Sequence, residues 1–202
     1  YPSLFNHSCV ANTTRNFIGD VLIMNSCRDI NKNEEITTCY VSPLDWYEKR
    51  EKHLEKFGFK CNCELCVLDK TDKKRILREE IYNNSNSGFN NEEQMKKIIE
   101  SLEKTYNNRE KYKFLLLKPL AIWQNFLLKS LKLEQCAKAN IACFDIWKDF
   151  NPDMACFSAM KTKKCYELAQ NSIEAKKWLE KAKENEVFNN MDFFLKRFEL
   201  LL

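Results

Sequence analysis

Three short stretches in the first third of the chain decide its fold. Residues 5–12 are FNHSCVAN, residues 33–40 are NEEITTCY, and residues 59–66 are FKCNCELC. The first two combine asparagine, histidine and paired glutamates with isolated cysteines and a tyrosine, and the third places three cysteines within six positions.

The sequence around the first two stretches predicts short strands. Residues 16–18 and 21–24 are mostly apolar and flank Gly19 and Asp20, a pattern that predicts a β-hairpin. A further strand is predicted from Ile36 to Tyr40. From Pro43 the apolar residues follow the period of an amphipathic helix, which should end at Gly58.

Beyond the cysteine cluster the sequence predicts helices. Few glycines and prolines interrupt it, and the clearest loop is the Asn/Ser-rich segment 83–91. The fold class is therefore predicted as α+β, with short strands first and a mainly helical region after them. We expect three units, at residues 1–42, 43–70 and 71–202. The helices predicted beyond residue 91 are at 92–106, 111–131, 135–150, 153–168, 173–184 and 191–201.

The composition excludes some classes of protein. With 44% hydrophobic residues the chain is not expected to be disordered, and a net charge of +4 is too mild to indicate nucleic-acid binding. No stretch approaches the roughly 20 apolar residues of a membrane span, and no secretory signal precedes the motifs. We therefore expect a protein of the cytoplasm, the nucleus or both, and ten cysteines in that setting favour metal ligands or free thiols over disulfides.

The spacing Cys61-x-Cys63-x-x-Cys66 suits one metal ion but leaves a tetrahedral site one ligand short. A fourth ligand must come from elsewhere in the chain. Four thiolates would make a closed, structural zinc site that holds the chain together without activating water. The alternative is three unrelated buried thiols, which the clustering disfavours.

Taken together and in this order, the three stretches resemble the SET domain of protein-lysine methyltransferases. The family pattern F-N-H-S-C-x-P-N matches residues 5–12, and G-E-E-[IL]-T-x-x-Y matches residues 33–40. The cysteine cluster falls where that family has its post-SET segment. The charged helix before the cluster resembles the SET and MYND-domain type in particular, although a relative with tetratricopeptide repeats and no MYND finger fits as well.

The resemblance implies a role for nine residues. The metal site would be completed by Cys9, the cofactor S-adenosylmethionine would be held by residues of the first stretch and by an aromatic ring on its adenine, and a tyrosine would orient the substrate lysine. The implied zinc ligands are Cys9, Cys61, Cys63 and Cys66; the implied cofactor contacts are Ser3, Asn6, His7 and Phe59; the implied catalytic residue is Tyr40. Each aromatic or histidine could also be an ordinary core residue.

Two positions depart from the family pattern. Ala11 replaces the usual proline, and Asn33 replaces the glycine before the paired glutamates, where asparagine tolerates a left-handed backbone. The family's glycine-rich cofactor loop and first SET strands are also not recognisable in the sequence. We therefore expect the C-terminal part of a SET domain, with an incomplete cofactor site and no activity by itself.

The helical region resembles a degenerate tetratricopeptide repeat. Tyr166, Ala175, Leu179 and Ala182 have suitable offsets for two packed helices, but an ordinary helical bundle explains the same small residues equally well. Either arrangement would pack or bind partner proteins. No ligand role is expected for His53 or for the six cysteines outside the cluster, which are predicted to be buried thiols: Cys27, Cys39, Cys136, Cys143, Cys156 and Cys165.

Three functions follow from these observations. The first is a zinc-stabilised, S-adenosylmethionine-dependent lysine methyltransferase that acts on a protein substrate, histone or non-histone. The second is a catalytically silent scaffold for protein partners, suggested by the missing cofactor loop. The third, a zinc-dependent nucleic-acid binder, lacks both a recognition-helix pattern and a basic stripe, and membrane binding is not expected.

Overall fold

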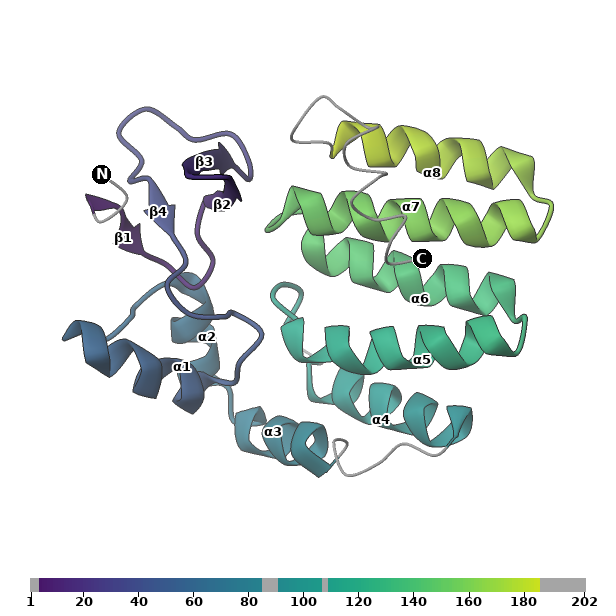
Figure 1. The fold of residues 1–202 in the computed structure, drawn as a ribbon. Coiled ribbons are helices and arrows are strands. Elements are labelled where there is room, and N and C mark those ends of the chain that lie inside the picture. The colour runs from purple at the N-terminus through teal and green to yellow at the C-terminus, as the bar shows by residue number, and fades with distance from the viewer. Residues whose placement is uncertain (1–3, 85–90, 107–108, 186–202) are drawn as a thin grey trace.

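The computed structural model describes residues 4–84, 91–106 and 109–185, and it confirms the predicted α+β class. Figure 1 shows two parts that face each other: the strands with helices α1 and α2 on one side, and a stack of helices on the other. Helix α3 (Arg75–Asn84) lies below and between them.

The strands form two small sheets. Strand β1 (Asn6–His7) pairs in parallel with β4 (Thr37–Thr38), so the first two stretches lie side by side although about 30 residues separate them. Strands β2 (Thr13–Ile18) and β3 (Val21–Ser26) form the predicted antiparallel hairpin. Gly19 at its turn has a φ of 57°, a conformation that favours glycine.

Strand β4 is shorter than the predicted strand at 36–40. A turn precedes it, in which Glu34 N–H donates to the Asn31 carbonyl at 3.0 Å and Asn33 has a φ of 67°. Asn33, which replaces the glycine of the family pattern, therefore takes the left-handed conformation that asparagine tolerates. After Thr38 the chain turns away, and the Tyr40 N–H bonds to a side chain, that of His7, at 2.9 Å.

The charged helix is shorter at its start than predicted and ends where predicted. Helix α1 (Tyr47–Leu54) begins after a turn in which Asp45 N–H donates to the Ser42 carbonyl at 3.2 Å. It continues as the 3₁₀ turn η2 (Glu55–Phe57) and stops at Gly58, whose φ is 76°.

The remaining helices follow the predicted order. Helix α2 (Glu64–Thr71) grows directly out of the cysteine cluster. The predicted helix at 111–131 starts late, because Tyr112 has a φ of 60° and residues Phe114–Leu116 form a 3₁₀ turn, η3. The predicted helix at 191–201 lies outside the described residues. The stack consists of α4 (Glu92–Thr105), α5 (Leu117–Lys129), α6 (Leu133–Trp147), α7 (Pro152–Leu168) and α8 (Ser172–Glu184).

Small side chains bring the helices of the stack close together. Ala137, Ala159 and Ala182 are fully buried, and the Phe144 and Trp178 rings meet edge to face at 5.3 Å. Asparagine caps begin α4, α7 and α8, each accepting a backbone N–H three residues on. The tetratricopeptide-like character of this stack stays a prediction.

The cysteines outside the cluster are buried, as predicted, except Cys39, which is half-buried with its sulfur 2.7 Å from the Val41 carbonyl oxygen. His53 is half-buried on α1 and belongs to no cluster of metal-binding side chains among the described residues. In the described ranges, no helix combines the length and apolar character that crossing a bilayer requires.

Candidate metal centre and adjacent cleft

The structure brings the four predicted cysteines into one cluster. The sulfurs of Cys9, Cys61, Cys63 and Cys66 all lie within 4.8 Å of one another, and those of Cys9 and Cys66 are 3.6 Å apart. Cys9 comes from the loop after β1, Cys61 and Cys63 from the segment that leads into α2, and Cys66 from the first turn of α2. Tetrahedral ligands about 2.3 Å from a zinc ion are roughly 3.8 Å apart, so the four sulfurs could hold such an ion.

Hydrogen bonds within the cluster shift the acidity of its thiols in opposite directions. Bonds from Cys63 and Cys66 hold the pKa of Cys61 well below its usual range, whereas bonds to Cys61 and its neighbours, together with burial, raise the pKa of Cys9. A cation that binds the four sulfurs as thiolates must displace the protons that they carry in its absence.

His7 connects the cysteine cluster to the second stretch. Its Nδ1 accepts the Tyr40 N–H at 2.9 Å, which leaves Nε2 as the protonated nitrogen, 3.3 Å from the sulfur of Cys9. Nε2 is therefore placed to donate to that sulfur. Because both ring nitrogens have partners, a cofactor contact from His7 would have to come from its backbone.

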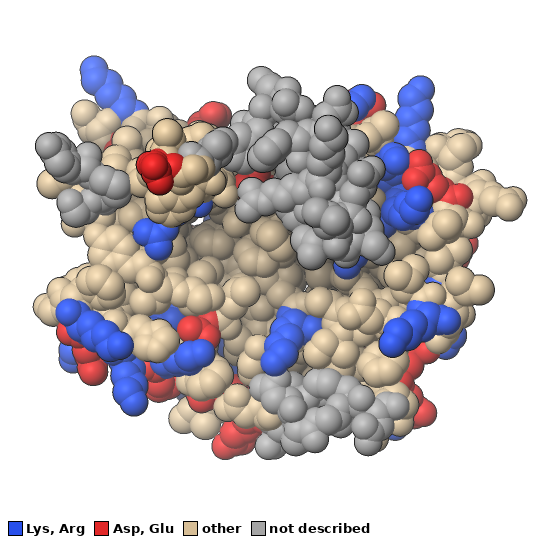
Figure 2. All heavy atoms as spheres, viewed as in Figure 1, with Lys and Arg blue, Asp and Glu red and all other residues tan. Residues whose placement is uncertain are grey.

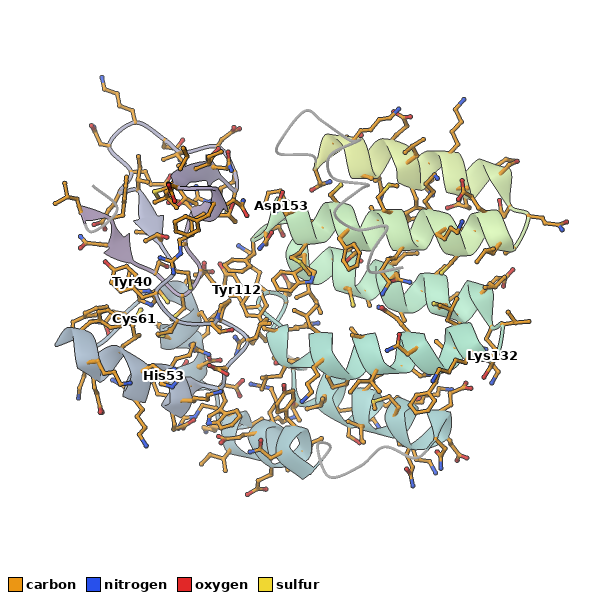
Figure 3. All side chains as sticks on the ribbon, in the orientation of Figure 1. Tyr40, His53, Cys61, Tyr112, Lys132 and Asp153 are labelled. Atoms are coloured by element: carbon orange, nitrogen blue, oxygen red, sulfur yellow. The ribbon has the colours of Figure 1, made fainter. Side chains whose placement is uncertain are left out.

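Tyr40 lies in a group of aromatic rings next to the cluster (Figure 3). Its ring centroid is 5.1 Å from that of His7, 5.1 Å from that of Phe57 and 6.4 Å from that of Phe59. Its hydroxyl donates to the Phe5 carbonyl at 2.5 Å. Phe59 remains 36% exposed and Phe57 55% exposed, so both rings offer free surface.

Sequence reasoning missed Phe57 as part of this group. The apolar period places it only on the predicted charged helix, but the left-handed turn at Gly58 brings the rings on either side of it to Tyr40. The sequence Phe-Gly-Phe at 57–59 was the available signal.

The other predicted cofactor contacts differ in what the structure shows. The exposed Asn6 donates from its side-chain amide to Glu35 Oε1 at 2.6 Å, so the second stretch positions it. Ser3 lies outside the described residues. The cofactor roles of Ser3, Asn6, His7 and Phe59 stay predictions, as does the catalytic role of Tyr40.

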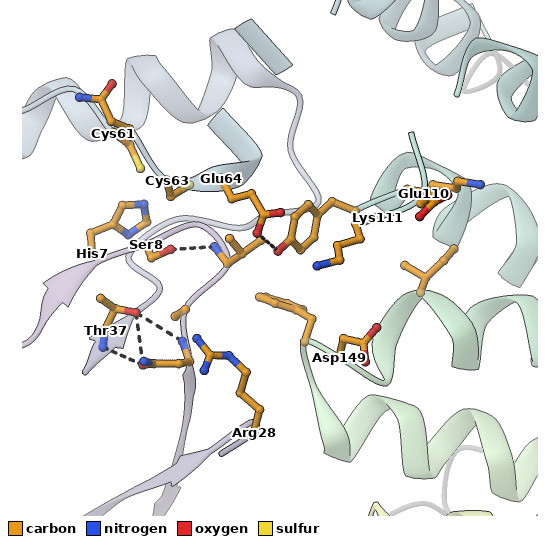
Figure 4. A pocket seen from close by; sticks show the side chains of 18 of the residues that line it. His7, Ser8, Arg28, Thr37, Cys61, Cys63, Glu64, Glu110, Lys111 and Asp149 are labelled. Carbon is orange, nitrogen blue, oxygen red and sulfur yellow. Dashed lines mark hydrogen bonds between the residues drawn. The ribbon is translucent and has the colours of Figure 1, made fainter. Parts of the chain in front are cut away.

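A cleft of about 1380 Å³ separates the cysteine cluster from the helical stack (Figures 2 and 4). His7, Phe59 and Cys61 line one side, and Leu120 and Phe150 line the other. Tyr112 spans the two sides, because its hydroxyl donates to Glu64 Oε2 at 2.5 Å. More carboxylates than basic groups line the cleft: Glu34, Glu35, Glu64, Glu103, Glu110, Asp145 and Asp149 against Arg28, Lys60, Lys111 and Lys113.

Comparison with known protein families identifies the first part of the chain. The sequence model of the SET domain family matches residues 1–41, which contain both stretches joined by β1 and β4. Residues 1–41 are SET-domain sequence. The recognition of the SET domain from its motifs is therefore confirmed.

Individual relatives extend the likeness past the SET segment. A protein of Gibberella zeae named "Methyltransferase" is 33% identical over 147 residues, which are 67% of this chain and 20% of the relative. Human "Histone-lysine N-methyltransferase SMYD3" is 37% identical over 83 residues, 40% of this chain and 19% of that protein. "Histone-lysine N-methyltransferase set5" of Schizosaccharomyces pombe is 36% identical over 77 residues, 37% of this chain and 24% of that protein.

These matches support the SET and MYND-domain (SMYD) type that the motifs indicated. The chain spans only about a fifth of the length of the relatives it matches.

Within this SET segment, Ala11 is 5% exposed, so the residue that replaces the usual proline is packed in the interior.

Proposed function

We propose that the chain is part of an S-adenosylmethionine-dependent protein-lysine N-methyltransferase. The observation that carries the proposal is the group formed by His7 and Tyr40 of the SET segment and Phe59 of the segment before the cysteine cluster, placed beside a cleft. Named lysine methyltransferases among the relatives support it.

The residues of the aromatic group suit methyl transfer to an amine. S-adenosylmethionine, when bound, supplies the electrophilic methyl group. A lysine amine must lose its proton before it can attack, and its ordinary pKa of about 10.4 makes that unfavourable in water. The Tyr40 hydroxyl could orient the amine, while the Phe57 and Phe59 rings remove water and favour its neutral form.

Two observations support binding of the cofactor near Phe59. Its ring is partly exposed 5.8 Å from the ring of His7, which leaves a face on which a planar base could stack. The polar, exposed Asn6 directly precedes His7 on the same strand, β1. Because Phe59 precedes the cysteine cluster by two residues, loss of a bound metal should weaken cofactor binding as well.

The acidic excess in the cleft supports a basic protein segment as substrate. Glu64, Glu110 and Asp149 lie on both sides of the cleft, so a lysine-rich chain would meet carboxylates from the SET side and from the helical stack. We propose that the four cysteines hold a structural zinc ion and thereby fix the wall that carries Phe59.

The test measures cofactor binding by calorimetry and methyl transfer to histone and non-histone proteins by mass spectrometry. It uses this chain and the longest protein that contains it. We expect Tyr40→Phe to retain cofactor binding and to reduce the rate of transfer by roughly 100-fold or more, as loss of a positioned hydroxyl does elsewhere. Tyr166→Phe, on the distant helix α7, is the control and should behave as the unchanged protein.

The result that would overturn the proposal is absence of cofactor binding in the longest protein, or full activity of Tyr40→Phe.

A scaffold function is the second candidate, favoured by two exposed apolar side chains at one end of the stack. Leu131, between α5 and α6, is 78% exposed, and Ile173, at the start of α8, is 81% exposed. Partner binding that is lost in Leu131→Ser and Ile173→Ser, without methyl transfer, would favour that candidate.

A further inference from the structure

A buried arginine lies directly beside the cysteine cluster. Arg50 on α1 is 2% exposed, and its Nη2 is 3.9 Å from the sulfur of Cys66 and 2.5 Å from Oδ2 of Asp69. Its Nη1 donates to the Asp45 carbonyl at 2.6 Å. A cation this deeply buried requires nearby negative charge, and the structure places the Asp69 carboxylate on one side of Arg50 and the sulfur of a potential metal ligand, Cys66, on the other.

Asp69 also binds Arg109, which lies in the segment between α4 and η3. Its second oxygen, Oδ1, accepts from Arg109 at 2.5 Å, and Arg109 is also nearly buried. The Arg109 side chain then donates to the carbonyls of Lys111 at 3.1 Å and Tyr112 at 3.2 Å. Charged contacts therefore run without a break from the cysteine sulfurs to the segment that leads from α4 into α5.

The charges along this path depend on the state of the sulfurs. A divalent ion with four thiolates has a net charge of −2, Asp69 has −1, and the two arginines have +2. Without a bound ion, the fixed net charge of −2 beside Arg50 is absent, and Asp69 is the carboxylate that remains in contact with it. Its position, and through Asp69 that of Arg109, should then be held less tightly.

We propose that Arg50 is an outer-sphere partner of the metal centre and couples metal binding to the docking of the helical stack on the SET segment. This inference rests on the proposed four-cysteine metal site. Arg50 lowers the electrostatic cost of gathering four thiolates, and Asp69 holds Arg50 and Arg109 in one arrangement. Arg50 is a positioning residue and takes no part in methyl transfer.

The first measurement is the zinc affinity of the 202-residue chain, determined by competition with a chromophoric chelator. Arg50→Met should weaken zinc binding by roughly 10- to 100-fold, the usual effect of losing an outer-sphere partner. Arg50→Lys keeps the charge without the planar fork and should fall between Arg50→Met and the unchanged chain.

Arg78→Met is the matched control. Arg78 is also 2% exposed and ion-paired, with Asp72 at 2.6 Å, but its contacts in the described part of the chain are with Asp72, Thr105 and the Tyr106 ring and not with a cysteine sulfur. It should lose stability and keep its zinc affinity. Equal zinc affinity in Arg50→Met and the unchanged chain would overturn this inference alone, whereas no zinc binding by the unchanged chain would overturn the metal site as well.

The second measurement tests the coupling by limited trypsin digestion. Arg109, Lys111 and Lys113 are the cleavage sites on the segment that Asp69 holds. Zinc should protect them several-fold in the unchanged chain and should give no such protection in Arg50→Met. Arg78→Met serves as control for zinc affinity only, because its partners Asp72 and Tyr106 also contact Arg109. If zinc has no effect on cleavage at these residues in the chain without substitutions, metal binding and docking are independent and the proposal is wrong.

Discussion

Asn12 is the residue that joins the two SET stretches. It is 4% exposed, and its side-chain oxygen accepts the Thr37 N–H at 2.9 Å. Its amide nitrogen donates to the Glu35 carbonyl at 2.8 Å and to Glu34 Oε1 at 3.1 Å. Figure 4 shows the bonds that converge on Thr37. This one side chain therefore positions the strand that leads to Tyr40.

Asn12→Ala should lower the free energy of unfolding by about 1–3 kcal/mol, because it leaves the Thr37 N–H without its partner in the interior. Urea denaturation measures the change. Lys32→Ala, at an exposed position in the neighbouring loop, should have an effect within about 0.5 kcal/mol of zero. Equal effects of the two substitutions would show that Asn12 contributes no more than a surface residue.

At the scale of single elements, the turn after α1 decides where the aromatic rings lie. Gly58 ends the helix in a left-handed conformation, with its N–H donating to the Glu55 carbonyl at 3.0 Å. A Cβ built on Gly58 meets no atom within 4 Å, so space is not what requires glycine. The requirement comes from the backbone conformation.

Gly58→Ala should therefore destabilise the chain by about 1–2 kcal/mol through backbone strain. Gly58→Asn should cost less, because asparagine tolerates this conformation better. Thermal or urea unfolding of both variants provides the comparison. If alanine and asparagine are equally tolerated, the turn relaxes on substitution and the argument from conformation fails.

Asp72, just after α2, gives a second prediction at this scale. Burial alone would raise the pKa of its carboxyl, but the hydrogen bonds from Arg78 at 2.6 Å and from the Lys74 N–H, together with the positive charges of Arg78 and Arg109, outweigh it, and the pKa lies below the ordinary 3.8. A lowered folded-state pKa stabilises the fold above the ordinary value, and this contribution disappears as the pH falls through the folded-state pKa.

Asp72→Asn should consequently be less stable than the unchanged chain at neutral pH, by about 2 kcal/mol, and this difference should shrink below about pH 4. Urea midpoints measured from pH 7 to pH 3 test it. Glu93→Gln removes a pair with Lys97 on α4 that also lowers the pKa of a carboxyl, but solvent screens this exposed pair, so its effect on the pH profile should be much smaller. A difference that stays constant with pH would contradict the charge-based explanation.

At the scale of the whole molecule, the two parts differ in how much core they contain. The part that contains the strands, α1 and α2 is called the SET part here. Its large buried apolar side chains are few, chiefly Tyr47, Leu54 and Leu65, whereas the stack from α4 to α8 buries many along its length. A small part with so little core usually needs a metal or another staple to stay folded. The cysteine cluster is placed to provide it.

Removal of metal should therefore loosen the SET part before the stack. After treatment with a strong chelator, we expect far-UV circular dichroism to retain most of the helical signal. Hydrogen exchange should become faster in residues 5–9 and 59–66, and stay slow in α6 and α7. A uniform loss of protection across the chain would show that the metal holds the whole molecule and not one part.

Some features of this protein follow from the sequence by itself. The hairpin about Gly19, the helix stop at Gly58 and the order of the helices were predictable, because turn residues and apolar periods act over a few positions. The motif order was also sufficient to recognise the SET segment. The spacing of Cys61, Cys63 and Cys66 predicted a metal site but left its fourth ligand open, and only the family resemblance pointed to Cys9.

The tertiary structure decided what depends on residues far apart in the chain. It placed Cys9 beside Cys66 across 57 positions, occupied both nitrogens of His7, and put Asp69 between two arginines. It also set the acidic cleft between the SET part and the stack. Such contacts leave no local pattern, because a charged residue on a helix looks solvent-exposed in the sequence until another element covers it, as Arg50 shows.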